Sequence, residues 1–383
     1  MDILKVIFKV VGGLTIGMVA GLLIAGVGII TFTDTSFSEL VDKIINIKIS
    51  DFFVGTLTGI ASLIVSVCVL TVLHEAGHLA AGLMSGYGFV SFRIFNLTVI
   101  KDDGKIRIKK FNVAGTGGQC LMSPPDLPIE KIPTTAYNAG GVAANLIALA
   151  VGIVLLIVVD NAIANVFLTI FCIVDSIIIL INGLPLRQGN DASNMKMLRR
   201  NPKAKRSIMI QLKANAMIQN GVRPKDMPAE WFESDCDIDY SNSLEVAMPL
   251  LEATRCIDTG EIEKAYGMFD RLYDHRGEMI NKYAKETTCE LAYLSMVTGR
   301  KDRAAELLDD NLTAYIKLYR KVMSSKDRIL CAKKIYLDND RETAAKIYRT
   351  LEKNRHKYLL QGEVDSDLAL MKEILSNADQ RPM

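Results

Sequence analysis

The stretch that decides the fold runs from Phe52 to His78 and reads FFVGTLTGIASLIVSVCVLTVLHEAGH. Its first part, up to Leu73, contains no charged side chain, and about 20 apolar residues are enough for a helix to cross a bilayer. The run ends in H-E-x-x-H, which on a helix places His74 and His78 one turn apart on one face, with Glu75 beside them. Ionisable groups are costly in such an apolar segment, so we interpret the cluster as functional.

The composition divides the chain into two halves. Its 383 residues are 50% hydrophobic, and the mean hydropathy of +0.22 is high for a soluble protein of this length. Long apolar runs occur almost only in residues 1–186, whereas most charged residues lie in 187–383. We therefore predict a membrane half and a soluble half. The net charge of +2 gives no indication of a nucleic-acid partner.

Four apolar segments predict four transmembrane helices in the first half. They lie near residues 10–33, 52–83, 134–159 and 161–186. The dipeptide Asp160-Asn161 separates the last two segments, so a tight turn is expected there. The lipid bilayer is thus the first predicted partner of the chain.

The distribution of charge around these segments predicts their orientation. The stretch 31–51 has four acids and two lysines, whereas 84–133 has seven Lys or Arg against four acids, and the residues after 186 are also basic. Because positive loops stay in the cytosol, the N-terminus, the 84–133 stretch and the C-terminal half are predicted to be cytosolic. Seven scattered cysteines without a C-x-x-C pair fit that location. We expect a multi-pass protein of a bacterial cytoplasmic membrane.

Two histidines do not complete a catalytic zinc site, which takes three protein ligands and one water. The remaining histidines, His275 and His356, lie in the soluble half without a partner pattern. The best third ligand is Asp191, because it and the H-E-x-x-H motif both lie at the cytosolic ends of predicted spans. The sequence therefore predicts one zinc ion per chain, bound by His74, His78 and Asp191.

With this third residue the chain resembles the site-2 protease family of intramembrane zinc metalloproteases. That family pairs H-E-x-x-H on one transmembrane helix with Asn-x-x-Pro and then Asp-Gly on a later one, and its Asp is the third zinc ligand. Here the later residues are Asn182, Pro185 and Asp191. The resemblance covers residues 52–192.

Two departures from the family pattern concern the surrounding loops and not the ligands. The stretch GGVAAN over 140–145 lacks the proline of the family's Gly-Pro-x-x-Asn motif and has a different spacing. Ala192 stands where the family has glycine.

The resemblance implies an intramembrane zinc endopeptidase that cleaves transmembrane segments or membrane-bound peptides. Zinc would lower the pKa of its water towards about 7, and Glu75 would take the proton as general base. Asn182 would donate to the substrate backbone or the oxyanion, or else only hold a helix end beside Pro185. Asp175 is interpreted as a structural contact to a neighbouring helix, with support of the metal ligands as the alternative. The rival function is a non-proteolytic membrane adaptor with a structural zinc.

Between the second and third spans, residues 89–110 predict a small β-hairpin against the membrane surface. The stretch 89–100 is β-prone, 102–104 is a turn signal, and 106–109 alternates apolar and basic side chains. Residues 115–125, with their glycines and prolines, predict an irregular loop. The hairpin is either a surface connector or an edge strand that pairs with an extended substrate above the metal.

The soluble half shows an internal repeat. Gly260, Gly299 and Asn339 are 39 and 40 residues apart, and each is followed five residues later by an alanine. Gly or Asn ends one helix, and a small residue lets the next helix pack closely. The pattern resembles tetratricopeptide-type helical hairpins with a period longer than the standard 34 residues. Partner or substrate docking, self-association and rigidification of the protease remain open roles.

The predicted architecture therefore has two domains. Residues 1–192 are predicted to form an all-α membrane bundle that carries the zinc site and the small membrane-associated β-hairpin or sheet. Residues 193–383 form a soluble α-helical repeat domain.

Overall fold

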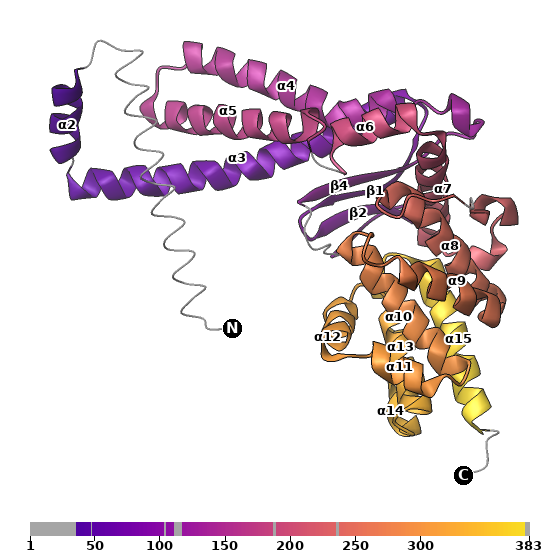
Figure 1. The fold of residues 1–383 in the computed structure, drawn as a ribbon. Coiled ribbons are helices and arrows are strands. Elements are labelled where there is room, and N and C mark those ends of the chain that lie inside the picture. The colour runs from indigo at the N-terminus through magenta and orange to yellow at the C-terminus, as the bar shows by residue number, and fades with distance from the viewer. Residues whose placement is uncertain are drawn as a thin grey trace.

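The computed structural model describes residues 36–46, 48–102, 105–110, 117–186, 189–234 and 237–379. The predicted span at 10–33 and the turn residues 103–104 lie outside this part of the chain. Apolar helices form one end of the molecule, a small sheet lies in the middle, and shorter helices form the other end (Figure 1).

Three long helices form an apolar bundle: α3 (Ile49–Met84), α4 (Thr135–Val158) and α5 (Ala162–Gly183). In the described part of the chain these are the three helices that are long and apolar enough to cross a membrane. Their outer faces carry exposed apolar side chains, such as Ile157 at 79% and Phe53 at 66% exposure. A surface of this kind requires an apolar environment. A short helix, α2 (Phe37–Ile45), precedes α3.

Glycines set the close crossing of α3 and α4. A Cβ atom on Gly140 would lie 2.4 Å from the carbonyl oxygen of Gly77, and one on Gly77 would lie 2.3 Å from the carbonyl oxygen of Gly140. Only glycine permits so close an approach. Glycines are common at the contacts between helices that pack in lipid. The crossing brings Gly141 and Asn145 of α4 against the H-E-x-x-H face of α3.

A four-stranded antiparallel sheet follows α3. Its strands are β1 (Gly88–Ile94), β2 (Leu97–Asp102), β3 (Lys105–Lys110) and β4 (Gly118–Ser123), in the order β3-β2-β1-β4. The chain runs from β1 to β2 to β3 as a meander, and β4 then pairs with the free side of β1. Strand β4 is therefore the edge that lies beside α3.

The sheet corrects two details of the prediction. The stretch 89–100 is not one strand, because the chain turns at Phe95, whose φ is +51°, and comes back as β2. The stretch 115–125 is not an irregular loop throughout, because it contains β4. Gly118 is part of this strand, and a Cβ there would lie 2.6 Å from the carboxylate of Glu75. This glycine allows a close approach to α3, which the sequence could not distinguish from a loop glycine.

Helices make up most of the remaining chain. They are α6 (Asp191–Arg200), α7 (Pro202–Gln219), α8 (Ser243–Thr259), α9 (Ile262–Asp274), α10 (Asn281–Val297), α11 (Lys301–Leu307), α12 (Asp310–Tyr319), α13 (Ser325–Tyr336), α14 (Arg341–Asn354) and α15 (Gln361–Asp379). Short 3-10 turns lie at η1 (Ile129–Lys131), η2 (Pro224–Asp226), η3 (Ala229–Phe232) and η4 (Arg355–Lys357).

The positions singled out by the repeat pattern have a common local structure. Gly260, Gly299 and Asn339 have φ values of +84°, +80° and +51°, which is the left-handed conformation that Gly and Asn adopt most easily after a helix. The three alanines that follow them are fully buried: Ala265, Ala304 and Ala344. The identification of these units as tetratricopeptide-type repeats stays a prediction.

The helical half contacts the sheet directly. Gln219 at the end of α7 donates from Nε2 to the carbonyl oxygen of Val90 at 3.1 Å, and Lys109 of β3 donates from Nζ to the carbonyl oxygen of Tyr358 at 3.4 Å. The sheet thus lies between the apolar bundle and the helices of the C-terminal half (Figure 1).

Candidate metal centre

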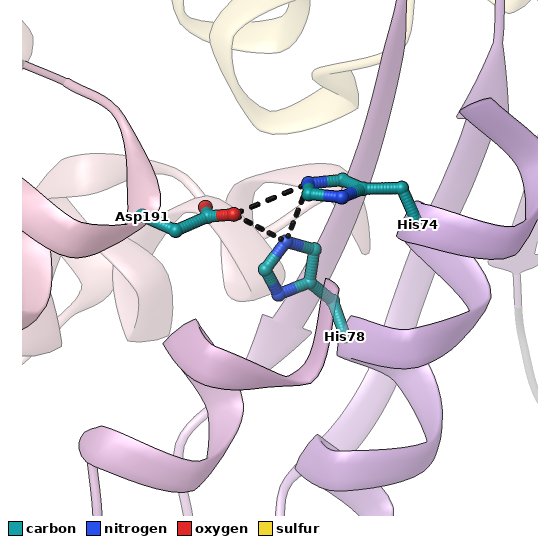
Figure 2. Close-up of side chains that lie close together, drawn as sticks. All are labelled: His74, His78 and Asp191. Carbon is teal, nitrogen blue, oxygen red and sulfur yellow. Dashed lines mark hydrogen bonds and ion pairs between the residues drawn. The ribbon is translucent and has the colours of Figure 1, made fainter. Parts of the chain in front are cut away.

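Three side chains converge where α3 meets the start of α6. His74 Nε2 lies 3.2 Å and His78 Nε2 lies 3.4 Å from Oδ2 of Asp191, and the two Nε2 atoms are 3.2 Å apart. Figure 2 shows the two imidazoles extending from one helix towards the carboxylate on the facing segment. The three residues predicted as ligands are therefore brought together, although Asp191 is 117 positions from His74 and 113 positions from His78 in the sequence.

The triangle of donor atoms has the dimensions of a zinc site. Zinc bonds of about 2.0–2.1 Å at tetrahedral angles separate the ligand atoms by about 3.3–3.4 Å. The separations of 3.2, 3.2 and 3.4 Å are close to this value. Two imidazole nitrogens and one carboxylate oxygen also form a donor set that zinc enzymes use, with the fourth position left for water.

Gly141 of α4 keeps space open beside the two imidazoles. A Cβ atom at this position would lie 2.5 Å from Nε2 of His78 and 2.7 Å from Nε2 of His74. Such an atom would crowd the space that an ion bound to both nitrogens needs. The second glycine of the GGVAAN stretch is thus explained by the ligands that it faces.

Hydrogen bonds orient both rings so that Nε2 faces Asp191. Nδ1 of His78 lies 2.8 Å from the carbonyl oxygen of Tyr137, and Nδ1 of His74 lies 2.6 Å from Oδ1 of Asn145. Both partners accept hydrogen bonds, so Nδ1 carries the proton and Nε2 keeps its lone pair for a metal. Asn145 in turn donates from Nδ2 to Oδ1 of Asp175 at 2.6 Å.

The position of Asp191 is fixed by its neighbour Asn190. The Asn190 side chain accepts from the backbone N–H of Ser193 at 2.8 Å and so caps the start of α6. Its Nδ2 donates to the carbonyl oxygens of Ile181 and Leu184, each at 2.7 Å, and ties α6 to the end of α5. Asn190 was not predicted from the sequence, although an Asn directly before the first residue of a helix is a capping signal.

Asp191 is ionised at neutral pH, as a metal ligand has to be. Burial opposes its ionisation, but hydrogen bonds and charge from His74 and His78, when their imidazoles are protonated in the absence of a metal, outweigh burial and lower the pKa of Asp191 to about 2.

Glu75 lies on the side of the cluster that faces strand β4. Its carboxylate lies near the backbone N–H of Cys120 and interacts electrostatically with both histidines and Asp191. Tyr137 donates from its hydroxyl to the carbonyl oxygen of the same Cys120 at 2.7 Å. The carbonyl oxygen of Cys120, on the outer edge of β4, is therefore bonded to the bundle, and its N–H lies near Glu75.

Arg93 anchors the start of this strand. It is 2% exposed, and its guanidinium donates to the carbonyl oxygen of Gly118 at 3.3 Å and to that of Phe95 at 2.9 Å. Gly118 is the residue that lies against the Glu75 carboxylate. Strand β4 is thus held beside Glu75 by contacts with Tyr137 of the bundle and with Arg93 of the sheet.

The other predicted or considered residues lie elsewhere. The Asn182 amide donates to the carbonyl oxygen of Ile178 in its own helix at 3.2 Å. His275 stacks on Tyr240 with 3.9 Å between ring centroids and pairs with Glu278 in the helical half.

Comparisons with known proteins do not identify the chain: no family model, no curated protein and no solved structure matches it. The function therefore has to be inferred from the geometry of the cluster.

Proposed function

We propose that the protein is a zinc metalloendopeptidase of the site-2 type, which hydrolyses peptide bonds in transmembrane segments or membrane-bound peptides. The observation that supports this most is the triangle formed by His74, His78 and Asp191, with separations of 3.2 to 3.4 Å. Glu75, the residue that H-E-x-x-H proteases use as base, lies beside this triangle.

In the proposed reaction the chain supplies ligands and a base. His74, His78 and Asp191 would hold one zinc ion, which when bound acts as a Lewis acid towards water and the scissile carbonyl. Glu75 would accept a proton from the attacking water and pass it to the leaving nitrogen. Because Glu75 is not a ligand in this arrangement, its replacement should separate metal binding from cleavage.

The substrate would bind in an extended form, because a helix keeps its carbonyl groups hydrogen-bonded. The free edge of β4 lies at the site and offers backbone groups for pairing with an extended peptide. At Cys120 the carbonyl oxygen is bonded to Tyr137 and the N–H lies near Glu75. A substrate strand that pairs there would displace Glu75 from the strand, so substrate binding would also free the base.

The surroundings of the site support a membrane setting. α3, α4 and α5 are apolar and long enough to cross a bilayer, and all ligands lie at one end of this bundle. We place this end near the cytosolic face, in agreement with the flanking positive charge. The helices of 193–383 would then lie in the cytosol, where they could bind substrates, protein partners or a second copy of the chain.

The rival proposal is a non-proteolytic adaptor whose zinc is structural. Structural zinc sites have four protein ligands, whereas the cluster found among the described residues has three. The carboxylate of Glu75 is also unnecessary for a structural site. Both observations favour the enzyme.

Metal removal and return test the proposal. The full chain is purified, reconstituted in lipid nanodiscs and incubated with fluorogenic transmembrane peptides that contain helix-weakening Gly and Asn residues. We expect cleavage that a chelator abolishes and that one equivalent of zinc restores. An adaptor would bind zinc equally well and cleave none of the peptides.

A further inference from the structure

Asp175 is a carboxylate in the middle of an apolar helix. It is 0% exposed, and the described part of α5 around it contains no other charged side chain. Its Oδ1 accepts from Nδ2 of Asn145 at 2.6 Å, whereas its Oδ2 makes no hydrogen bond to a described residue. Burial of an acid in an apolar helix costs free energy, so an acid at such a position indicates a function.

In the two hydrogen bonds that link Asp175 through Asn145 to His74, the donor and the acceptor are fixed. Nδ2 of Asn145 donates to Asp175, so the NH₂ group of the amide faces the carboxylate, which in its ionised form can only accept. The oxygen of Asn145 then faces His74, which requires the proton on Nδ1. Nε2 of His74 consequently keeps its lone pair in the direction of Asp191.

The two histidines differ in how this orientation is secured. Nδ1 of His78 faces the main-chain carbonyl of Tyr137, which cannot present a donor instead. Nδ1 of His74 faces an amide side chain, which can rotate by half a turn and exchange its oxygen for its NH₂ group. Only the amide needs a further residue to select one of its two orientations.

We propose that Asp175 is a positioning residue of the metal site: by holding the Asn145 amide in one orientation, it selects the His74 tautomer that binds zinc. This inference rests on the proposed zinc function. The residue acts through Asn145 and touches neither the metal nor the substrate. Loss of such supporting contacts typically weakens metal binding about 10- to 100-fold.

A purely structural Asp175 would instead join α4 and α5 by an interhelical hydrogen bond. Asp175→Asn separates the two roles, because an amide at 175 still bonds Asn145 and still joins the helices. It does not fix the orientation of the Asn145 amide, since it can donate as well as accept.

The experiment measures the zinc dissociation constant of the full chain in nanodiscs by competition with a chromophoric chelator. The variants are Asp175→Asn, the exchange Asn145→Asp with Asp175→Asn, and the control Ser176→Ala, whose hydroxyl bonds Cys172 in its own helix. We expect about 10- to 100-fold weaker binding for Asp175→Asn. The exchange should return binding to within a few-fold of wild type, because the carboxylate then accepts directly from His74. Ser176→Ala should bind as wild type does.

The inference is overturned if Asp175→Asn binds zinc as tightly as wild type. It is also overturned if the exchange variant, with an unchanged melting temperature in the metal-free state, binds as weakly as Asp175→Asn. These outcomes leave the proposed protease intact if wild type binds zinc and cleaves. Failure of the proposed function looks different: wild type itself then binds no zinc, or binds zinc without cleaving.

Discussion

Gly141 lies where α4 passes the two imidazoles, and its missing side chain leaves the space that a metal ion would use. We expect Gly141→Ala to reduce zinc occupancy by at least about tenfold, because a Cβ would lie 2.5 to 2.7 Å from both Nε2 atoms. Zinc per chain, measured by atomic emission on purified protein, checks this. A suitable control is Gly59→Ala, since a Cβ at Gly59 of α3 meets nothing within 4 Å. Full zinc content in Gly141→Ala would contradict the placement of the ion.

The third ligand gives a second prediction at the same scale. Asp191→Ala should lose zinc binding, because it removes the only carboxylate in the donor triangle that contacts both imidazoles. Asn182→Ala should retain zinc, since the Asn182 amide bonds its own helix. Isothermal titration of both variants with zinc distinguishes them. Equal affinities would show that Asp191 is not a ligand.

At this scale the sequence predicted the residues that cluster at the site but not the residues that support them. His74, Glu75 and His78 follow from a motif whose spacing matches one helical turn, and Asp191 from its place after a later apolar segment. Asn145 and Asn190 act through contacts that depend on how α4, α5 and α6 cross. No local pattern encodes these crossings, so the network behind the ligands could not be predicted.

At the scale of elements, strand β4 connects the sheet to the bundle. Tyr137 donates to the carbonyl oxygen of Cys120, Glu75 lies near its N–H, and Arg93 donates to the carbonyl oxygen of Gly118. The strand is therefore part of the site, although its residues include no metal ligand. Its existence could not be read from the sequence, because its pairing with β1 joins segments that are separated by two other strands.

We predict that Tyr137→Phe increases kcat/KM for an extended peptide substrate. The change removes the donor to Cys120, and a hydrogen bond of about 1 kcal/mol corresponds to roughly a fivefold effect. The control is Tyr87→Phe, whose hydroxyl donates to the carbonyl oxygen of Pro133 and whose ring stacks on Tyr137. A decrease in kcat/KM for Tyr137→Phe with no change in zinc content would count against strand pairing at β4.

At the scale of the whole molecule, an apolar bundle is combined with helices that contain buried ion pairs. Arg328 of α13 bonds Glu290 of α10 at 2.7 Å and Asp367 of α15 at 2.6 Å, and Lys326 bonds Glu286 at 2.7 Å. The sequence predicted where the chain changes from apolar to charged. It also predicted Gly260, Gly299 and Asn339 as the residues that follow the ends of three helices. It did not predict which charges would be buried, because the packing of α10, α13 and α15 decides this.

This network makes stability depend on pH. Burial, with added repulsion from Asp367, Glu286 and Glu290 and in opposition to Lys326, raises the pKa of Glu363 to about 8. In the unfolded chain its pKa is about 4.3, so between these values the folded state binds more protons than the unfolded state. This residue therefore makes the protein less stable as pH rises from about 5 to 8.

Glu363→Gln should remove that part of the pH dependence. Thermal unfolding of the variant should show a smaller fall in melting temperature between pH 5 and pH 8 than wild type shows, and a higher melting temperature at pH 8. Glu373→Gln, an exposed position on the same helix, should behave as wild type does. Parallel curves for wild type and Glu363→Gln would contradict the raised pKa.

Cleavage and zinc content, measured on the same preparations of wild type and Glu75→Gln, test the proposed enzyme most directly. Glu75 lies beside the donor triangle without being part of it, so both proteins should hold one zinc per chain. The variant should cleave the transmembrane peptide at least about 10² times more slowly, because the general base is lost. Cleavage by zinc-loaded Glu75→Gln at the wild-type rate would show that the mechanism is wrong.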